Sequence, residues 1–189
     1  VKNDKVLRLT MLFHDMGKPV MKTTDENGRD HFKGHAIASE QIAKTVMKRL
    51  KFDNDTIRKV TKLVAYHDYR MEPTGANVRR AMHEIGAELF PYYLAVRLAD
   101  TKAQSSYERR GKLENIIQIR ELYRNALRNK ECVTLKDLAV TGTDLINLGI
   151  APGKELGTLL NELLDMVIED PAWNQKGKLC DYVKERFGF

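Results

Sequence analysis

Imidazole and carboxylate side chains stand at the ends of several apolar segments of this sequence. The residues that share this setting are His14, Asp15, His35, His67 and Asp100. The run LTMLF at 9–13, for example, leads directly into His14 and Asp15. Burying an imidazole and a carboxylate without partners is costly. We therefore expect either a bound metal ion or a network of mutual hydrogen bonds, and the residue types alone leave both alternatives open.

The chemistry of these groups points to phosphate esters. Imidazole nitrogens and carboxylate oxygens together favour first-row divalent ions, and such an ion polarises a phosphoryl oxygen and lowers the pKa of a water nucleophile. A bound ion of this kind would suit a phosphoester substrate, while mutual hydrogen bonds among these groups remain the alternative. His31 and His83 lack the same setting, and we expect structural roles for them.

Helices must position these residues, because apolar side chains recur with helical spacing along the whole chain while strand-like alternation is scarce. The predicted fold class is all-α, a helical bundle followed by a helical tail. The expected helices cover approximately 5–15, 35–50, 53–68, 77–85, 91–104, 111–129, 152–169 and 176–186, with short capped helices near 134–138 and 143–146.

Two local features of the first 50 residues carry specific expectations. Gly17 and Pro19 are predicted to end the first helix, with Gly17 in the left-handed conformation and a loop after it. The Asn-Gly turn signal within 23–29 indicates a short hairpin-like excursion. In the second helix, the apolar residues expected to share one face are Ile37, Ala38, Ile42, Val46 and Leu50.

Composition and charge narrow the class of protein. The 189 residues include 42% hydrophobic and 31% charged side chains, as in ordinary folded domains. No apolar run reaches the roughly 18 residues of a membrane span, and Cys132 and Cys180 have no disulfide or zinc-ribbon spacing, so we expect a reducing, cytoplasmic location. Residues 97–136 contain 10 Lys and Arg against 5 Asp and Glu. This segment suits a polyanion such as nucleic acid, although a solvated basic surface explains it equally well.

The run HDMGK at 14–18 resembles the signature of the HD superfamily of metal-dependent phosphohydrolases. Pairs that match its later motifs follow in order: Gly34-His35, Tyr66-His67 and Ala99-Asp100. The superfamily pattern also includes a histidine upstream of the His-Asp pair, and residues 1–13 contain none. Together with a first residue that is not Met, this predicts that the chain is part of a longer protein.

The HD resemblance implies a phosphohydrolase that holds one or two divalent metal ions, either a transition metal or magnesium, and acts on a nucleotide or other phosphoester substrate. The implied roles are as follows: His14, Asp15 and Asp100 ligate one metal ion; His35 and His67 can hold a second; Asp15 and Lys18 are catalytic, with Lys18 facing a phosphate.

Three further segments, 97–104, 135–146 and 149–157, resemble the C-terminal part of bacterial tRNA nucleotidyltransferases, the CCA-adding enzymes, and this similarity covers nearly all 189 residues. In that family an N-terminal head adds nucleotides with paired carboxylates after a Gly-Ser motif, and this chain has no such motif. The resemblance implies an HD domain at 1–131, a helical tail at 132–189, and tRNA as a partner.

The basic segment gains a role from that resemblance. The residues expected to follow RNA phosphates are Arg109, Arg110, Lys112, Arg120, Arg124 and Arg128. Three functions remain compatible with the sequence: a metal-dependent phosphohydrolase domain within a nucleotidyltransferase, a nonenzymatic tRNA-binding scaffold, and a free-standing nucleotide phosphohydrolase.

Overall fold

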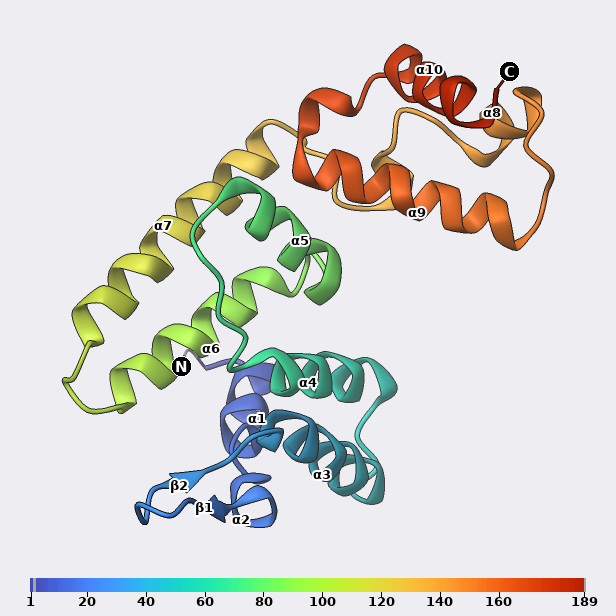
Figure 1. Ribbon diagram of the computed structural model, residues 1–189. Coiled ribbons are helices and arrows are strands. Elements are labelled where there is room, and N and C mark those ends of the chain that lie inside the picture. Colours follow the sequence, from blue (N-terminus) through green and yellow to red (C-terminus); the bar gives the residue numbers. More distant parts are fainter. Residues whose placement is uncertain (2, 189) are drawn as a thin grey trace. The chain divides into compact units, whose positions relative to one another are not determined.

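The computed structural model describes residues 1 and 3–188 and confirms the predicted all-α fold class (Figure 1). Its longer helices are α1 (Lys5–Phe13), α3 (His35–Arg49), α4 (Asn54–Tyr66), α5 (Gly75–Ile85), α6 (Phe90–Ala103), α7 (Arg109–Arg128), α9 (Lys154–Glu169) and α10 (Lys176–Phe187). Shorter elements are α2 (Lys18–Met21), α8 (Gly142–Asn147) and two 3-10 helices, η1 (Leu135–Asp137) and η2 (Pro171–Trp173). Within the described residues, none of the helices is long and apolar enough to cross a membrane.

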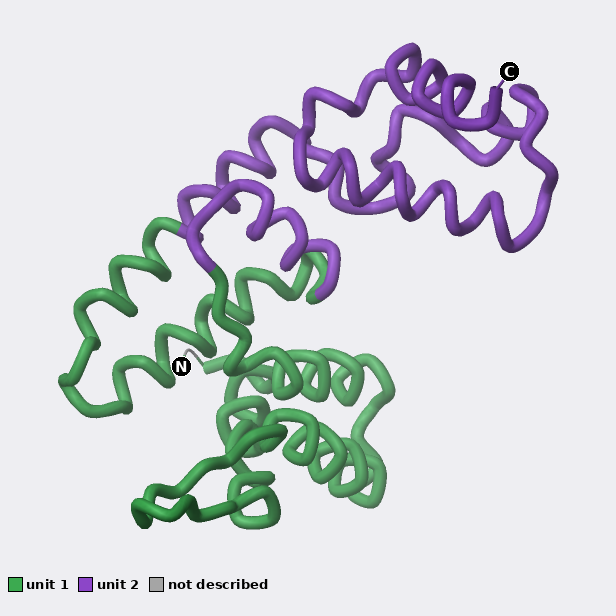
Figure 2. Tube along the Cα trace, viewed as in Figure 1, with its two compact units in different colours: residues 1–71, 85–118 green, residues 72–84, 119–189 purple. Residues whose placement is uncertain are grey.

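The chain forms two compact units, coloured separately in Figure 2. Unit 1 comprises residues 1–71 and 85–118, and unit 2 comprises 72–84 and 119–189. Helix α7 therefore begins in unit 1 and ends in unit 2. Both units are discontinuous in sequence, and the domain boundary expected after residue 131 lies inside unit 2.

The part of unit 1 that carries most of the candidate ligands has a small apolar core between α1, α3 and α4. Its fully or nearly buried members are Phe13, Ala43, Met47, Ile57, Val60 and Val64. Helix α1 begins where the Asp4 carboxylate accepts a hydrogen bond from the backbone N–H of Leu7, and α4 begins where Asp53 accepts one from that of Thr56. These caps satisfy backbone donors that have no partner within the helix, so both helices start at defined residues.

Helix α3 buries a different face from the expected one. Ile37 and Leu50 remain more than half exposed, at 53% and 59%, whereas Ser39, Ala43 and Met47 are fully buried. The prediction of one shared apolar face is therefore wrong. The reason is that the small side chains of Ser39 and Ala43 allow neighbouring segments to pack closely against this face of α3. These close contacts stabilise the fold more than the burial of Ile37 would.

Gly17 provides one such neighbour, and its expected conformation is also corrected. It has φ −80° and ψ −12°, which is right-handed, and it begins α2 with Pro19 in the first turn. A Cβ atom at Gly17 would lie 2.4 Å from the carbonyl oxygen of His35. Its backbone N–H donates to Ser39 Oγ at 2.8 Å. Glycine is needed here for close approach to α3, rather than for a left-handed turn.

A two-stranded hairpin follows α2, as the turn signal predicts. Strand β1 (Thr23–Thr24) pairs antiparallel with β2 (Asp30–His31), and Gly28 between them has φ +75°. The hairpin returns the chain to Gly34, whose φ of +84° sets the start of α3. This left-handed glycine places His35 as the first residue of that helix.

Unit 2 has its own core around α9. Leu145, Leu163, Leu179 and Val183 are completely buried within it. The short helix α8 begins with a reciprocal cap between Thr141 and Asp144. Gly149, with φ +104°, follows its end, as expected for a helix terminator.

A buried arginine joins distant segments of unit 2. Arg79 donates to the carbonyl oxygens of Ile168 at 2.7 Å and Glu169 at 3.0 Å, the last residues of α9. It also donates to the Glu131 carboxylate at 2.7 Å. Helix α5 is thereby bound to the C-terminus of α9, where the helix dipole favours a positive charge.

Candidate metal centre

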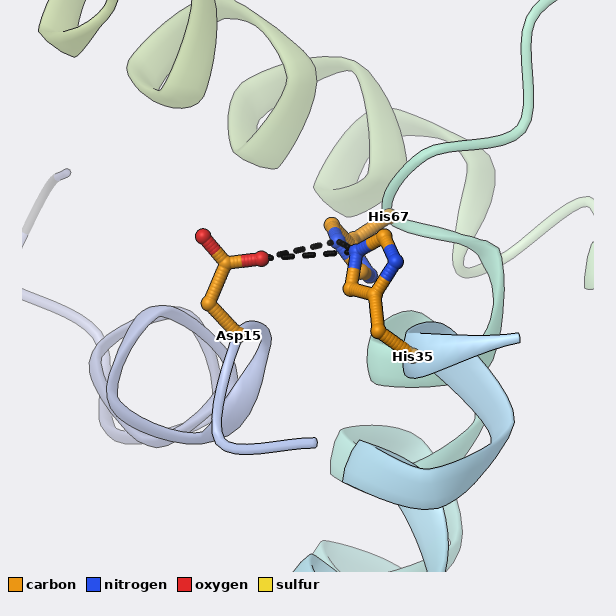
Figure 3. Close-up of side chains that lie close together, drawn as sticks. All are labelled: Asp15, His35 and His67. Atoms are coloured by element: carbon orange, nitrogen blue, oxygen red, sulfur yellow. Dashed lines mark hydrogen bonds and ion pairs between the residues drawn. The ribbon is translucent and has the colours of Figure 1, made fainter. Parts of the chain in front are cut away.

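Three ligand atoms meet in unit 1, from elements widely separated in sequence (Figure 3). Asp15 Oδ1 lies 3.4 Å from His35 Nε2 and 3.6 Å from His67 Nε2. The two Nε2 atoms lie 3.1 Å apart. Figure 3 shows the carboxylate on one side and the two imidazoles on the other, with their polar atoms facing one another.

Helix ends position these groups. His14 and His67 are the C-cap residues of α1 and α4, Asp15 follows in the turn toward α2, and His35 opens α3. The contact between Gly17 and α3 fixes the turn that carries Asp15 against the start of the helix that carries His35. The site therefore depends on the packing of three helices rather than on one flexible loop.

The histidine tautomers follow from their backbone partners. Each of the three rings directs Nδ1 at the carbonyl oxygen three residues earlier: His14 at Met11 (2.8 Å), His35 at Phe32 (2.9 Å) and His67 at Val64 (2.7 Å). A carbonyl oxygen only accepts, so each Nδ1 carries the proton. In the neutral rings the Nε2 lone pairs are then available, and a backbone carbonyl on the other nitrogen is the usual support for a metal-ligating histidine.

The triangle of Asp15 Oδ1, His35 Nε2 and His67 Nε2 fits a metal ion. Its edges of 3.1, 3.4 and 3.6 Å leave a point about 2.1 Å from all three atoms, which is the length of a zinc–nitrogen or zinc–oxygen bond. Two neutral imidazoles whose lone pairs face each other repel unless a cation or proton lies between them. Two nitrogens and one carboxylate oxygen form a donor set suited to a first-row divalent ion.

Burial supports the neutral state of one ligand. The His67 side chain is 3% exposed, and this burial lowers the pKa of His67 below its ordinary value, with nearby His14 and His35 adding to the effect. A histidine must be neutral to bind a metal. Burial therefore favours the neutral form of His67, which is the form that binds a metal ion.

His14 and Asp100 form a second pair beside the triangle. His14 Nε2 lies 3.3 Å from Asp15 Oδ2 and 3.8 Å from Asp100 Oδ1. Interaction with Asp100 raises the pKa of His14, and the same interaction lowers the pKa of Asp100. Gln104 donates to the other oxygen of Asp100 at 2.7 Å. The HD resemblance groups His14 and Asp100 with Asp15 around one ion, whereas the three closest ligand atoms are those of Asp15, His35 and His67.

A pocket of about 610 Å³ opens over these residues. Lys18 lies in its wall and donates to Asp15 Oδ2 at 2.6 Å. Lys33 and Arg70 also line the pocket. Lys33 and Arg70 were not predicted from the sequence, because neither belongs to a motif. The pocket lining thus includes three cations and three carboxylates, the latter being Asp15, Asp68 and Asp100. The Lys and Arg side chains can contact an anionic ligand there, while the carboxylates and imidazoles can contact a metal ion.

The other candidate residues lie elsewhere. His31 pairs with Asp25 in the exposed hairpin at 2.8 Å, and His83 donates to the carbonyl oxygen of Val133 at 2.9 Å. Both contacts are structural, in agreement with the roles expected for these two histidines.

The basic residues expected to follow RNA all belong to α7. Arg110 pairs with Glu114 at 2.9 Å, and Arg124 pairs with Glu121 at 2.7 Å. Arg120 and Arg128 form no ion pair with any residue that the structure describes. Lys112 and Arg109 both donate to Gln104.

Residues 35–183 match the family described as tRNA nucleotidyltransferase domain 2. The chain belongs to this family. It is also 30% identical over 168 residues to a CC-adding tRNA nucleotidyltransferase of Thermus thermophilus. That match covers 86% of this chain but only 36% of the relative, so the tRNA nucleotidyltransferase-family chain described here corresponds to about a third of that protein. No solved structure matches the chain.

Proposed function

We propose that unit 1 of this tRNA nucleotidyltransferase-family chain is a metal-dependent phosphohydrolase of the HD type. The observation that carries the proposal is the triangle of Asp15 Oδ1, His35 Nε2 and His67 Nε2 at the floor of a cation-lined pocket. Three ligand atoms at bond-compatible separations support a divalent metal ion, and Lys18 beside them supports a phosphate substrate.

The reaction is hydrolysis of a phosphoester. A divalent ion at the triangle supplies a Lewis acid that polarises a phosphoryl oxygen and acidifies water. The water oxygen forms a new bond to phosphorus and gives up a proton, the bond between phosphorus and the leaving alcohol oxygen breaks, and the leaving oxygen takes up that proton. Lys18 holds the phosphate through its positive charge, and it also holds Asp15 in place. His14 Nε2, 3.3 Å from Asp15 Oδ2, lies where the HD resemblance implies a further metal ligand.

The family and the charge distribution support a second part of the proposal, that the chain binds tRNA as part of a CCA-adding or CC-adding enzyme. The similar Thermus thermophilus protein carries the name of a CC-adding tRNA nucleotidyltransferase. Helix α7 presents Arg120 and Arg128 without an ion pair among the described residues, so their charges remain available to phosphates.

Metal content and hydrolysis test the first part directly. The purified chain is dialysed against Zn²⁺, Mn²⁺ or Mg²⁺, its bound metal is measured by mass spectrometry, and hydrolysis of 4-nitrophenyl phosphate and bis(4-nitrophenyl) phosphate is followed. We expect Asp15→Ala to lose both bound metal and hydrolysis, since it removes the anionic ligand of the triangle.

Asp68→Ala is the matched control, because Asp68 is also preceded by a histidine but is exposed and pairs with Arg70. We expect it to keep the metal. If Asp68→Ala strips the ion while Asp15→Ala retains it, the assignment of the site is wrong.

A nonenzymatic tRNA-binding scaffold is the second candidate function, supported by the family match over residues 35–183. In that case the chain binds a metal ion and tRNA, yet neither 4-nitrophenyl ester is cleaved with any of the three ions. Hydrolysis that disappears with Asp15→Ala excludes this alternative.

A further inference from the structure

A second pocket lies within unit 1, next to the candidate metal centre. It has a volume of about 520 Å³ and is lined on its polar side by Arg70, Arg97, Lys112, Asn115 and Glu108. Arg70 also lines the pocket over the metal triangle. A shared wall residue means that the two pockets adjoin.

A chain of hydrogen bonds also links the pockets. Lys112 donates to the side-chain oxygen of Gln104 at 3.2 Å, and Gln104 donates to Asp100 at 2.7 Å. Asp100 interacts in turn with His14 beside the triangle. The amide of Gln104 is thus oriented by a group from each pocket, and Lys112 is held at a fixed distance from the metal centre.

The second pocket is suited to an anion. Arg70, Arg97 and Lys112 line the pocket with the single carboxylate of Glu108. Arg70 pairs with Asp68 at 3.0 Å, so Arg97 and Lys112, which form no ion pair among the described residues, carry the available charge. Arg97 is held by donation from one terminal nitrogen to the carbonyl oxygen of Tyr69 at 2.8 Å, which leaves its other N–H groups for a ligand. A planar guanidinium fixed in this way binds a phosphate through paired hydrogen bonds.

We propose that this pocket binds a second phosphate of the substrate, so that the metal centre acts on a phosphoester at the end of an oligonucleotide rather than on a mononucleotide. This inference rests on the proposed phosphohydrolase function. Two kinds of substrate carry a second phosphate near the one that is cleaved. An internucleotide phosphodiester is one source of it, and a further phosphate on the same nucleoside is the other.

Three substrates distinguish the sources: adenosine 3′-monophosphate, adenosine 3′,5′-bisphosphate, and the dinucleotide ApA with a 3′-phosphate. We expect kcat/KM for the dinucleotide to exceed that for the monophosphate at least tenfold. We expect the bisphosphate to resemble the monophosphate. A preference for the bisphosphate alone, or equal rates on all three, overturns the proposal.

Substitutions in the second pocket test whether that pocket causes the preference for the dinucleotide. Arg97→Gln and Lys112→Gln should each reduce the dinucleotide-to-monophosphate ratio of kcat/KM about tenfold, mainly through KM, because each removes a charge from the second pocket only. Arg97→Lys keeps the charge and should recover part of the ratio. Lys48→Gln, an exposed residue on α3, is the matched charge control and should leave the ratio unchanged. A ratio that survives both glutamine substitutions overturns the proposal.

A binding assay in which no hydrolysis takes place tests the second phosphate site separately from the proposed phosphohydrolase function. In EDTA, a fluorescent ApA 3′-phosphate should bind the wild-type chain more tightly than Arg97→Gln or Lys112→Gln by about tenfold, measured by anisotropy. If no substrate is hydrolysed but this binding difference is found, the hydrolase proposal fails and the second phosphate site stands. Hydrolysis without any binding difference supports the hydrolase and overturns the second phosphate site.

Discussion

The Nε2 atoms of His35 and His67 lie 3.1 Å apart, although both rings donate their Nδ1 protons to backbone carbonyls. The close approach of two lone pairs distinguishes this cluster from an ordinary hydrogen-bonded group. A metal ion between the two nitrogens, with Asp15 as the third ligand, would remove this repulsion, as would a proton shared by the two rings.

The first prediction ranks the ligands. His67→Ala removes one corner of the triangle and should lower Zn²⁺ affinity more than a hundredfold. Asp100→Asn changes a neighbour of the triangle, and the loss should be about tenfold, as for other residues that support metal ligands from outside. Competition with a chromophoric chelator measures both. A larger loss for Asp100→Asn would favour the grouping of Asp100 with Asp15 and His14 around the ion.

The second prediction concerns the contact of Gly17 with α3. Gly17→Ala places a methyl group against backbone that cannot move aside easily, and it should lower the free energy of unfolding by about 1–3 kcal/mol and weaken metal binding. Gly157→Ala on α9 is the control, because nothing lies near its Cβ position. Replacement there should raise stability by up to about 1 kcal/mol. Urea titration gives both values, and equal effects would contradict the role of Gly17.

The third prediction concerns unit 2. Arg79→Met should lower the free energy of unfolding by about 3 kcal/mol, because it leaves the Glu131 carboxylate, whose side chain is 16% exposed, without its positive partner and frees two carbonyl groups of α9. Arg80→Met on the same helix breaks only an exposed pair with Glu169, and its effect should stay below about 1 kcal/mol. Chemical denaturation compares them, and a small effect of Arg79→Met would show that the buried pair contributes little.

The fourth prediction tests tRNA binding by α7. Arg120→Glu combined with Arg128→Glu should weaken tRNA binding and reduce the dependence of log K on log salt by about 0.7–0.9 for each RNA phosphate that these arginines no longer neutralise. Arg124→Glu should have a smaller effect, since Glu121 already neutralises Arg124. Lys178→Glu, in the acidic tail, serves as the control. Filter binding at several salt concentrations gives the slopes, and a slope that the double variant leaves intact would exclude α7 as the binding surface.

The fifth prediction concerns pH. Hydrogen bonding with Lys176 and Thr141 lowers the pKa of Asp144 to about 2. A carboxylate with a lowered pKa stabilises the folded state above its unfolded pKa of about 3.9, and this contribution disappears as the pH falls toward 2. Wild-type protein should therefore have a higher Tm than Asp144→Asn at pH 7, and the gap should narrow between pH 4 and pH 2. A difference in Tm that stays constant from pH 4 to pH 2 would show that the ionised Asp144 carboxylate does not cause it.

The helices were predictable from sequence because their ends carry local signals. Asp53 before α4 and Gly149 after α8 act on backbone groups within a few residues, so their effect is visible in a short window of sequence. The candidate ligands were predictable for a related reason, since each stands where an apolar segment ends. Such a setting can be recognised without knowing what packs against it.

Contacts between distant segments were not predictable. Gly17 has the sequence context of a helix terminator, and only the backbone of α3 nearby shows why a side chain is excluded. The inward face of α3 was misjudged because burying Ser39 depends on the N–H of Gly17, 22 residues earlier. Arg70 belongs to no motif, and Arg97 was noted only as part of the similar segment 97–104. Their common pocket arises only when α6 and the segment after α4 come together.

The hydrogen bond from Arg79 to the carbonyl oxygen of Ile168 joins two residues that lie 89 positions apart in the sequence. A ribosome adding 5–20 residues per second needs roughly 4–18 s to synthesise that interval. Helix α5 therefore leaves the ribosome several seconds before its partner exists, and during this time Arg79 remains hydrated and Glu131 is translated without a folded α9 beside it. Unit 2 can close only after residue 168 has been synthesised, so premature termination before that residue leaves α5 without its contact to α9.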